Sequence, residues 1–283
     1  MIRFVWFDGK AGRPRPNVDC NDPRLITPAI SRGSSQSTGC AGVDGLGRVD
    51  GLRRVGWVRS AVVSAAEFVP DGAGLEELRT ASLACRGCHL YENATQTVFS
   101  KGPVSARIVL VGEQPGDVED RRGEPFVGPA GKLLDRAVAD AGLDPDQTYT
   151  TNAVKHFKFT PGAGGKRRIH ATPDSHEVGA CRPWLVAEFA VLDPQVVVAL
   201  GATAGKALFG PSFRVTKSRG MLLPWPASAQ APEQFSHGDD GAASAAFALA
   251  TIHPSAVLRA DDRDAAYAGL VSDLRIAAGA LAG

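Results

Sequence analysis

Short apolar runs bounded by turn residues alternate with helical patterns along the chain after Pro70. The run RIVLV, from Arg107 to Val111, has the length and the flanking glycine of a buried strand. From Pro129, PAGKLLDRAVADAGL repeats apolar residues at helical spacing and closes at Gly142, so it predicts an amphipathic helix. A buried strand followed by such a helix is the repeating unit of α/β proteins.

The alternation continues to the carboxyl end. TYTTNAVKHF contains a second strand, and Asp174 with Glu177 three residues later is a capping pair for a helix that reaches Leu192. QVVVALG predicts a third strand, ATAGKALFG a helix, FALATIHP a fourth strand, and Asp262 to Ala280 a final helix. This order predicts an α/β protein, a three-layer αβα fold with a mainly parallel four-stranded sheet.

The amino-terminal part has neither the alternating nor the helical apolar period. It is rich in Gly, Arg and Ser from about Lys10 to Trp57. We interpret residues 1–66 as a disordered extension and residues 67–283 as the folded domain. The same composition fits upstream sequence translated from a wrongly chosen start, with the real beginning near Val58 to Ala65.

Bulk charge gives no argument for a nucleic-acid partner, because the formal charge is only +1. Any such argument rests on local clusters. The amino terminus holds an apolar run of only four residues, and no stretch approaches the roughly 18 apolar residues of a membrane span. We expect a cytoplasmic monomer without membrane association.

Polar residues gather where the predicted strands end, and ligands of parallel sheets bind beyond that edge. GEQPGD follows the first strand and carries Glu113, Gln114 and Asp117, two carboxylates and an amide that suit acid–base or electrophile-stabilising chemistry. An ordinary polar turn is the alternative for this hexapeptide alone. TNAVKH and HPS mark the ends of the second and fourth strands.

Two further features carry chemistry. Cys85 and Cys88 have the CxxC spacing, which alone permits zinc, an iron–sulfur cluster or a redox pair. The stretch GGKRRIHATP places His170 two positions after a run of three cations, Lys166, Arg167 and Arg168. Such cations can neutralise DNA phosphates, with affinity that falls as salt rises. A solvated basic loop whose histidine merely contacts phosphate is the alternative.

Several ordered motifs carry a family resemblance. GEQPGD, EPFVGPAGKLLD, TNAVKH, CRPW and HPS resemble the uracil-DNA glycosylase superfamily, in its iron–sulfur branch related to family 4, and the KRRIH loop resembles the UdgX subfamily. The resemblance covers roughly Phe68 to Ala278. It implies the uracil-DNA glycosylase-like version of the predicted fold and an enzyme that excises uracil from DNA, with single strands favoured.

The resemblance also implies how the base is bound. Phe126 would stack on the extruded base, Asn152 would read its edge by donating to O4 and accepting from N3–H, and Gln114 belongs to the same binding set. His253 would donate a hydrogen bond to uracil O2 as negative charge builds on the leaving base. Taken singly, Phe126 fits core packing, and Asn152 and His253 fit turns.

The remaining roles come from the same resemblance. Ser255 and Arg259, with the KRRIH cations, would hold DNA phosphate. The ligands of a four-iron, four-sulfur cluster would be three cysteines and a histidine: Cys85, Cys88, His156 and Cys181. The histidine departs from the family 4 pattern and matches that of UdgX, and zinc held by the same set is the competing interpretation.

The covalent step is the last implication. His170 would capture the electrophilic sugar in place of water, with Glu113 orienting it or stabilising the cation and Asp117 as a weaker candidate for activating water. The protein would then bond to the abasic site and turn over essentially once. The alternatives are a conventional multiple-turnover family 4 glycosylase in base excision repair and a non-catalytic nucleic-acid-binding module with a zinc site.

Overall fold

The structure is a computed structural model that describes residues 64–164, 167–225 and 246–282. Nearly all of the predicted extension, residues 1–66, lies outside the described residues, and so does Lys166. The described residues belong to one compact unit.

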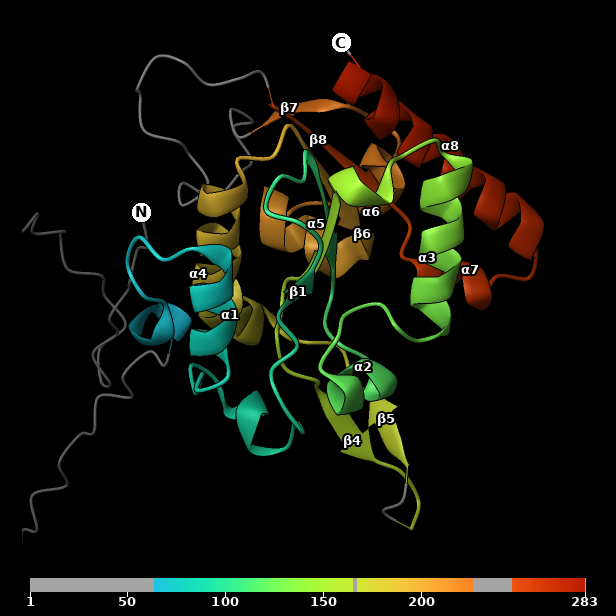
Figure 1. Ribbon diagram of the computed structural model, residues 1–283. Helices are drawn as coiled ribbons and strands as arrows, with labels where there is room; N and C mark the ends of the chain where they lie inside the picture. The colour runs from blue at the N-terminus through green and yellow to red at the C-terminus, as the bar shows by residue number, and fades with distance from the viewer. Residues whose placement is uncertain (1–63, 165–166, 226–245, 283) are drawn as a thin grey trace, which may run out of the picture. The chain divides into compact units, whose positions relative to one another are not determined.

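A mixed six-stranded sheet forms the centre of this unit, in the order β1-β3-β2-β6-β8-β7 (Figure 1). Its four inner strands are parallel: β3 (Thr148–Asn152), β2 (Ile108–Gly112), β6 (Val196–Leu200) and β8 (Ala246–Thr251). These confirm the four predicted strands. Two short antiparallel strands, β1 (Ser100–Lys101) and β7 (Leu223–Trp225), add edges that the sequence analysis missed, because β1 has only two residues and β7 only three, with a proline at its centre.

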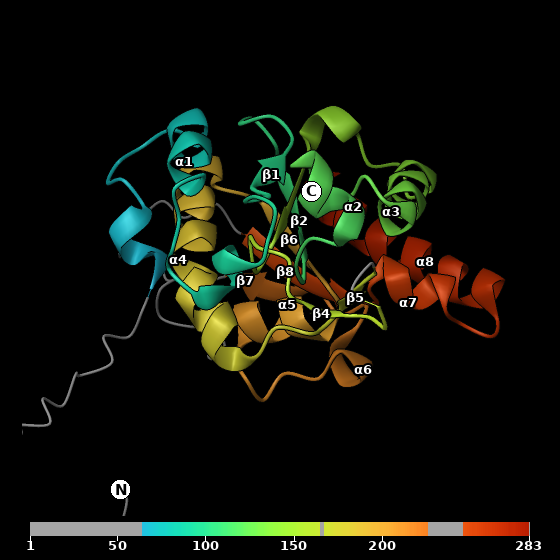
Figure 2. The ribbon, with the colours of Figure 1, turned by 90° about the horizontal axis from the view of Figure 1, so that it is seen from below.

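Helices cover both faces of the sheet, as the three-layer prediction requires (Figures 1 and 2). The first face carries α1 (Leu75–Ser82), α4 (Ser175–Leu192) and α5 (Gly201–Phe209), and the second α3 (Pro129–Asp140), α7 (Pro254–Leu258) and α8 (Arg263–Ala282). The long helices confirm the sequence prediction. None of the described helices is both long and apolar enough to cross a membrane.

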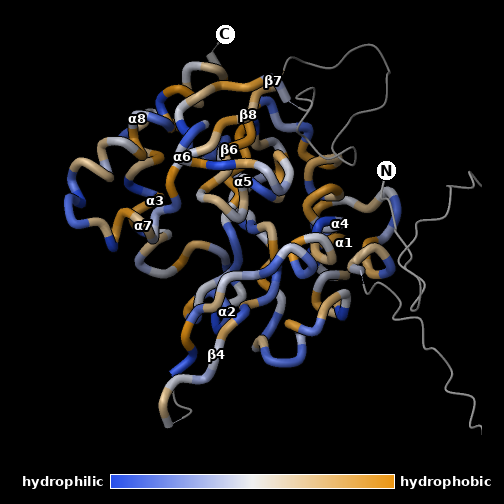
Figure 3. Tube along the Cα trace, turned by 180° about the vertical axis from the view of Figure 1, so that it is seen from behind, coloured by the Kyte–Doolittle hydropathy of each residue, from blue (hydrophilic) through white to orange (hydrophobic). Residues whose placement is uncertain are grey.

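Side-chain alternation along each strand divides the core into two layers. Val109 and Val111 pack with α4 and α5, whereas Ile108 and Leu110 pack with α3 and α8. All four are fully buried. Figure 3 shows hydrophobic residues along β8, another inner strand covered on both faces. A continuous apolar run is therefore what these inner strands require.

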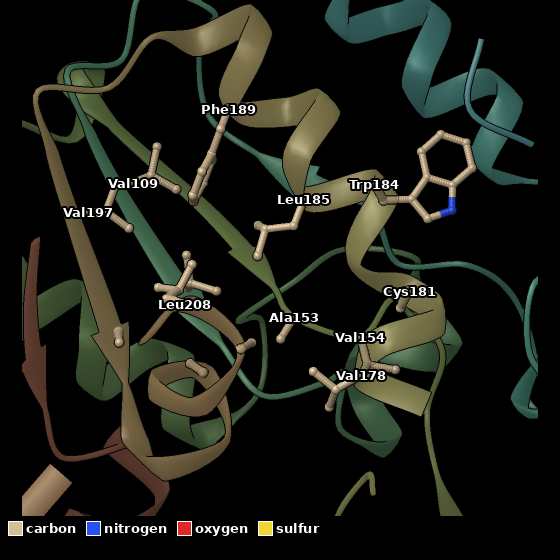
Figure 4. Close-up of a cluster of buried hydrophobic side chains, with 14 of the residues drawn as sticks. Val109, Ala153, Val154, Val178, Cys181, Trp184, Leu185, Phe189, Val197 and Leu208 are labelled. Atoms are coloured by element: carbon tan, nitrogen blue, oxygen red, sulfur yellow. The ribbon is translucent and has the colours of Figure 1, made fainter. Parts of the chain in front are cut away.

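Helix α4 links the sheet to the amino-terminal segment. Its predicted cap is confirmed, because the Asp174 side chain accepts from the Glu177 amide and the Glu177 side chain accepts from that of Asp174. Figure 4 shows Leu185 and Phe189 pointing from α4 towards the strands, while Trp184 points to the opposite side. The helix thus packs on the sheet with one flank and on the segment before β1 with the other.

A hairpin and a short helix stand beyond the carboxyl ends of the inner strands (Figure 1). The hairpin pairs β4 (Phe159–Pro161) with β5 (Arg168–His170), and its register places Phe159 opposite His170. Helix α2 (Asp117–Arg122) lies next to it. The smaller elements are η2 (Ala65–Phe68), η3 (His89–Glu92), η4 (Pro145–Gln147) and α6 (Val215–Ser218).

Candidate active site

A cavity of about 570 Å³ opens at the carboxyl edge of the sheet. It collects residues from the ends of β2, β3 and β8 and from the hairpin. The predicted site residues that line it are Glu113, Gln114, Asp117, Phe126, Asn152, His170, His253, Ser255 and Arg259. Segments up to 146 residues apart in sequence, from Glu113 to Arg259, therefore meet around one space large enough for a nucleobase and its sugar.

The floor of the cavity depends on a glycine. A Cβ on Gly112 would lie 2.3 Å from Asn152 Oδ1 and 2.6 Å from Phe126 Cζ, so only glycine lets these two side chains meet over the end of β2. Phe126 has a φ of 57°, a left-handed conformation that is costly for an aromatic residue. Gly131 accommodates that backbone, since a Cβ there would overlap the Phe126 carbonyl. The aromatic ring is thus held at the cavity by the local fold.

His253 is fixed as a neutral hydrogen-bond donor. It caps α7, and its Nδ1 accepts from the Ser255 amide at 3.1 Å. Because Nδ1 accepts, the proton of the neutral ring is on Nε2. Burial lowers the pKa of His253 to about 4, and the charges of Arg259 and His170 act in the same direction. The ring therefore presents an N–H at neutral pH without carrying charge.

His170 lies beside a carboxylate. Its Nε2 is 3.4 Å from Glu113 Oε1, and the other Glu113 oxygen accepts a short hydrogen bond from the Thr203 hydroxyl. The sequence analysis missed Thr203. Its position in the first turn after the third predicted strand, at the same edge of the sheet, was the signal that could have found it.

Gln114 lines the cavity, and its side-chain amide is bound to the backbone of the hairpin. Its side-chain nitrogen donates to the carbonyls of Lys158 and Ala171, and its oxygen accepts from the Lys158 amide. These three hydrogen bonds join the two ends of the hairpin to the loop after β2. The side chain was predicted to bind substrate, whereas in the structure both ends of its amide are occupied by the backbone.

Arg168 also differs from its prediction as a phosphate contact. Its side chain is only 15% exposed and pairs with Asp117 at 2.5 Å and with Asp120 at 2.6 Å. The guanidinium also lies over the rings of Phe157 and Phe159. It is therefore enclosed by protein groups. Arg167, by contrast, is exposed, and Lys166 falls outside the described residues.

The same ion pair bears on Asp117. Partial burial opposes ionisation of this carboxyl, but hydrogen bonds and charge from Arg168 and Arg121 prevail and lower its pKa. A carboxylate stabilised in this way is a weaker base. The structure thus gives Asp117 the role of anchoring the hairpin, which competes with the predicted role of activating water.

Three of the four predicted cluster ligands are buried thiols in one apolar layer: Cys85, Cys88 and Cys181. The indole of Trp184 donates to Cys85 Sγ and the Lys155 amide to Cys181 Sγ, each at 3.2 Å. Burial raises the pKa of Cys181 to about 12, and charge on the other two thiols acts in the same direction. The three sulfur atoms are thus near enough to influence one another.

The fourth predicted ligand, His156, is buried as well. Its Nε2 lies 3.1 Å from the Thr97 hydroxyl, and burial lowers its pKa to about 4, which keeps the imidazole neutral as metal ligation requires. Among the described residues, no three His, Cys, Asp or Glu side chains converge closely enough to hold a single metal ion. Three buried thiols and a neutral imidazole are donor types that suit either an iron–sulfur cluster or zinc.

Comparison with known proteins agrees with this geometry. The family model for the uracil DNA glycosylase superfamily matches residues 99–275. A type-4 uracil-DNA glycosylase of Thermotoga maritima is 37% identical over 142 residues, which cover 50% of this chain and 69% of the relative. That of Sulfurisphaera tokodaii is 35% identical over 156 residues, 53% of this chain and 67% of the relative. A third, from Archaeoglobus fulgidus, is 36% identical over 135 residues, 48% of this chain and 63% of the relative. The matched segment holds the αβα core and every residue placed around the cavity, and on these grounds the chain belongs to the uracil DNA glycosylase superfamily.

Proposed function

We propose that this protein excises uracil from DNA and then bonds covalently to the abasic sugar through His170, as the resemblance to the UdgX subfamily implies. The observation that carries the proposal is the position of His170, paired with Glu113 on the wall of the cavity that also holds Phe126 and His253. A nucleophile and a leaving-group stabiliser then face the same substrate.

Three residues around the cavity, Phe126, Asn152 and His253, carry out base excision in this proposal. The extruded uracil stacks on Phe126, and the Asn152 amide reads O4 and N3–H. As the bond between C1' and N1 breaks, its electron pair leaves with the uracil, and His253 donates its Nε2–H to the O2 atom on which charge develops. A neutral His253 ring is suited to this role. It stabilises the negative charge on the uracil by a hydrogen bond, and the protein does not have to bury a charged imidazolium in the cavity.

Capture uses the hairpin. Loss of uracil leaves an oxocarbenium-like sugar that is electrophilic at C1'. Contact with Glu113 through one nitrogen of the His170 ring leaves the other nitrogen with a lone pair, which forms the bond to C1'. The ring becomes cationic, and the Glu113 carboxylate stabilises that charge or accepts the N–H proton. In this proposal the bond between His170 and C1' is the end of the reaction, so each molecule reacts once.

The cluster and the DNA contacts complete the proposal. Cys85, Cys88, Cys181 and His156 would hold a four-iron, four-sulfur cluster, which supplies a covalent cross-link between the amino-terminal segment, α4 and the loop after β3. Backbone phosphates would be bound by the exposed side chains of Arg167 and Arg259, together with Lys166 and Ser255.

A denaturing gel tests the function. The protein is incubated with labelled single-stranded oligonucleotide that contains one uracil, then heated in SDS. A shifted band that is lost in His170→Ser supports the covalent bond, and His176→Ser is the matched control because that exposed histidine lies away from the cavity. Abasic product without a shifted band contradicts the bond.

Conventional multiple-turnover glycosylase activity is the second candidate. It is favoured by the type-4 glycosylases among the similar proteins. The two candidates differ in stoichiometry. With substrate in tenfold excess, a single-turnover protein releases about one uracil per molecule, and a conventional enzyme consumes all of the substrate.

A further inference from the structure

Glu113 holds two partners at once, one on each carboxylate oxygen. Oε1 faces His170 Nε2 at 3.4 Å, and Oε2 accepts a short hydrogen bond from the Thr203 hydroxyl. The hydroxyl belongs to the first turn of α5, which starts directly after β6. The contact therefore comes from an element unconnected with the hairpin.

Sheet register explains why these groups meet. Strands β2 and β6 are neighbours and parallel, with Val111 opposite Ala199. Glu113 is two residues beyond Val111, and Thr203 is four residues beyond Ala199 in the following helical turn. Two adjacent strand exits thus deliver a carboxylate and a hydroxyl to one point, next to Val111 and Ala199, which are fully buried.

We propose that Thr203 is a positioning residue, which holds the Glu113 carboxylate so that its free oxygen engages His170. The inference rests on the function proposed above. A glutamate has three side-chain torsions, and the Glu113 side chain is 21% exposed, so without an anchor it can turn towards water. Donation by a hydroxyl to an ionised carboxylate is a strong, directional bond that suppresses this motion.

Loss of the Thr203 hydroxyl should change the competition between His170 and water for the sugar. Once uracil has left, the cationic sugar reacts either with His170 or with water. A correctly held Glu113 orients the ring nitrogen and stabilises its developing charge, and so favours capture. Losing a hydrogen bond to a charged group slows the step that depends on it by roughly ten- to hundredfold. Water then takes a larger share, and free abasic DNA accumulates.

Two variants separate the hydroxyl from the shape of the side chain. Thr203→Val keeps the size and branching but removes the donor, and Thr203→Ser keeps the donor but removes the methyl group. Thr216→Val on α6 is the control, since this exposed threonine does not line the cavity. In each protein, released uracil and heat-stable adduct are measured in the same single-turnover reaction.

The expected result concerns the ratio of adduct to released uracil. We expect a ratio near one for wild type, Thr203→Ser and Thr216→Val, and below about one half for Thr203→Val. An unchanged ratio in Thr203→Val overturns the inference, and so does an equal fall in Thr203→Ser, which would assign the effect to packing. If wild type releases uracil without any adduct, capture by His170 is itself refuted, and the role of Thr203 with it.

Discussion

Arg168 Nη1 lies 2.6 Å from Asp120 Oδ2, and the aspartate is fully buried. The same carboxylate accepts from the Thr95 amide, so its two oxygens link three segments: the loop before β1, α2 and β5. The arginine is two residues from His170 on the same strand. This pair therefore fixes the end of the hairpin that carries the proposed nucleophile.

Replacing Asp120 with Asn should be strongly destabilising. It leaves the Arg168 charge enclosed with less compensation, and breaking one side of a buried ion pair costs about 3 to 5 kcal/mol. The measurement is the free energy of unfolding by denaturant. Arg121→Gln is the matched control, because it removes the exposed partner of Asp117 and should cost under about 1 kcal/mol. Equal losses of unfolding free energy in the two variants would show that the buried ion pair contributes no more to stability than the exposed one.

Strands β2, β6 and β8 were predictable because each is covered on both faces and carries an apolar run, as in residues 107–111, whereas the fourth inner strand, β3, has the sequence TYTTN and lacks such a run. Strand β1 has only two residues and β7 only three, one of them a proline, so neither segment is long enough to predict a strand. The hairpin was read as a loop for the same reason. Its pairing of Phe159 with His170 joins polar and aromatic residues without a regular alternation.

Motif positions predicted which residues meet at the cavity, but not what each one contacts. Gln114 and Arg168 carry groups suited to substrate or phosphate, but in the folded protein the hairpin backbone binds the Gln114 amide and the buried Asp120 carboxylate binds the Arg168 guanidinium. Thr203 was missed because a threonine in a helical turn carries no chemical signature. Its contact with Glu113 arises from strand register, which a single sequence does not contain.

Gly112→Ala should block substrate binding while the fold survives. The new methyl group would collide with Asn152 and Phe126, the two residues proposed to hold the base. We expect uracil excision to fall about a hundredfold or more, with a stability cost of about 1 to 3 kcal/mol. Excision is followed by alkaline cleavage of a labelled oligonucleotide.

The control for that variant is Gly179→Ala in α4, where a Cβ meets nothing within 4 Å. This change should leave excision at the wild-type rate and stabilise the helix by about 0.5 to 1 kcal/mol. Wild-type excision by Gly112→Ala would contradict the proposed binding site.

Cys181→Ser tests the metal centre. If the four proposed ligands hold an iron–sulfur cluster, the purified wild-type protein is brown and contains about four irons, and the variant loses colour, iron and thermal stability together. Cys20→Ser, outside the proposed ligand set, should change none of these. A colourless wild-type protein with one bound zinc would favour the competing metal.

The depressed pKa of His253 predicts how stability depends on pH. The folded ring has a pKa of about 4, whereas an unfolded histidine titrates near 6.5. At a pH between these values the ring is therefore protonated in the unfolded state and neutral in the folded state. Stability therefore falls as the pH drops through this window. From pH 7 to pH 5 the contribution of this one residue is roughly 1 to 2 kcal/mol.

His253→Asn isolates that contribution, because asparagine also caps a helix but does not titrate. Unfolding by denaturant at pH 7 and pH 5 should show a smaller loss for the variant than for wild type. The other titratable groups are present in both proteins and cancel in the comparison. Equal losses would mean that His253 is protonated as readily in the folded cavity as in the unfolded chain, and a charged ring could not serve as the neutral donor on which excision is proposed to depend.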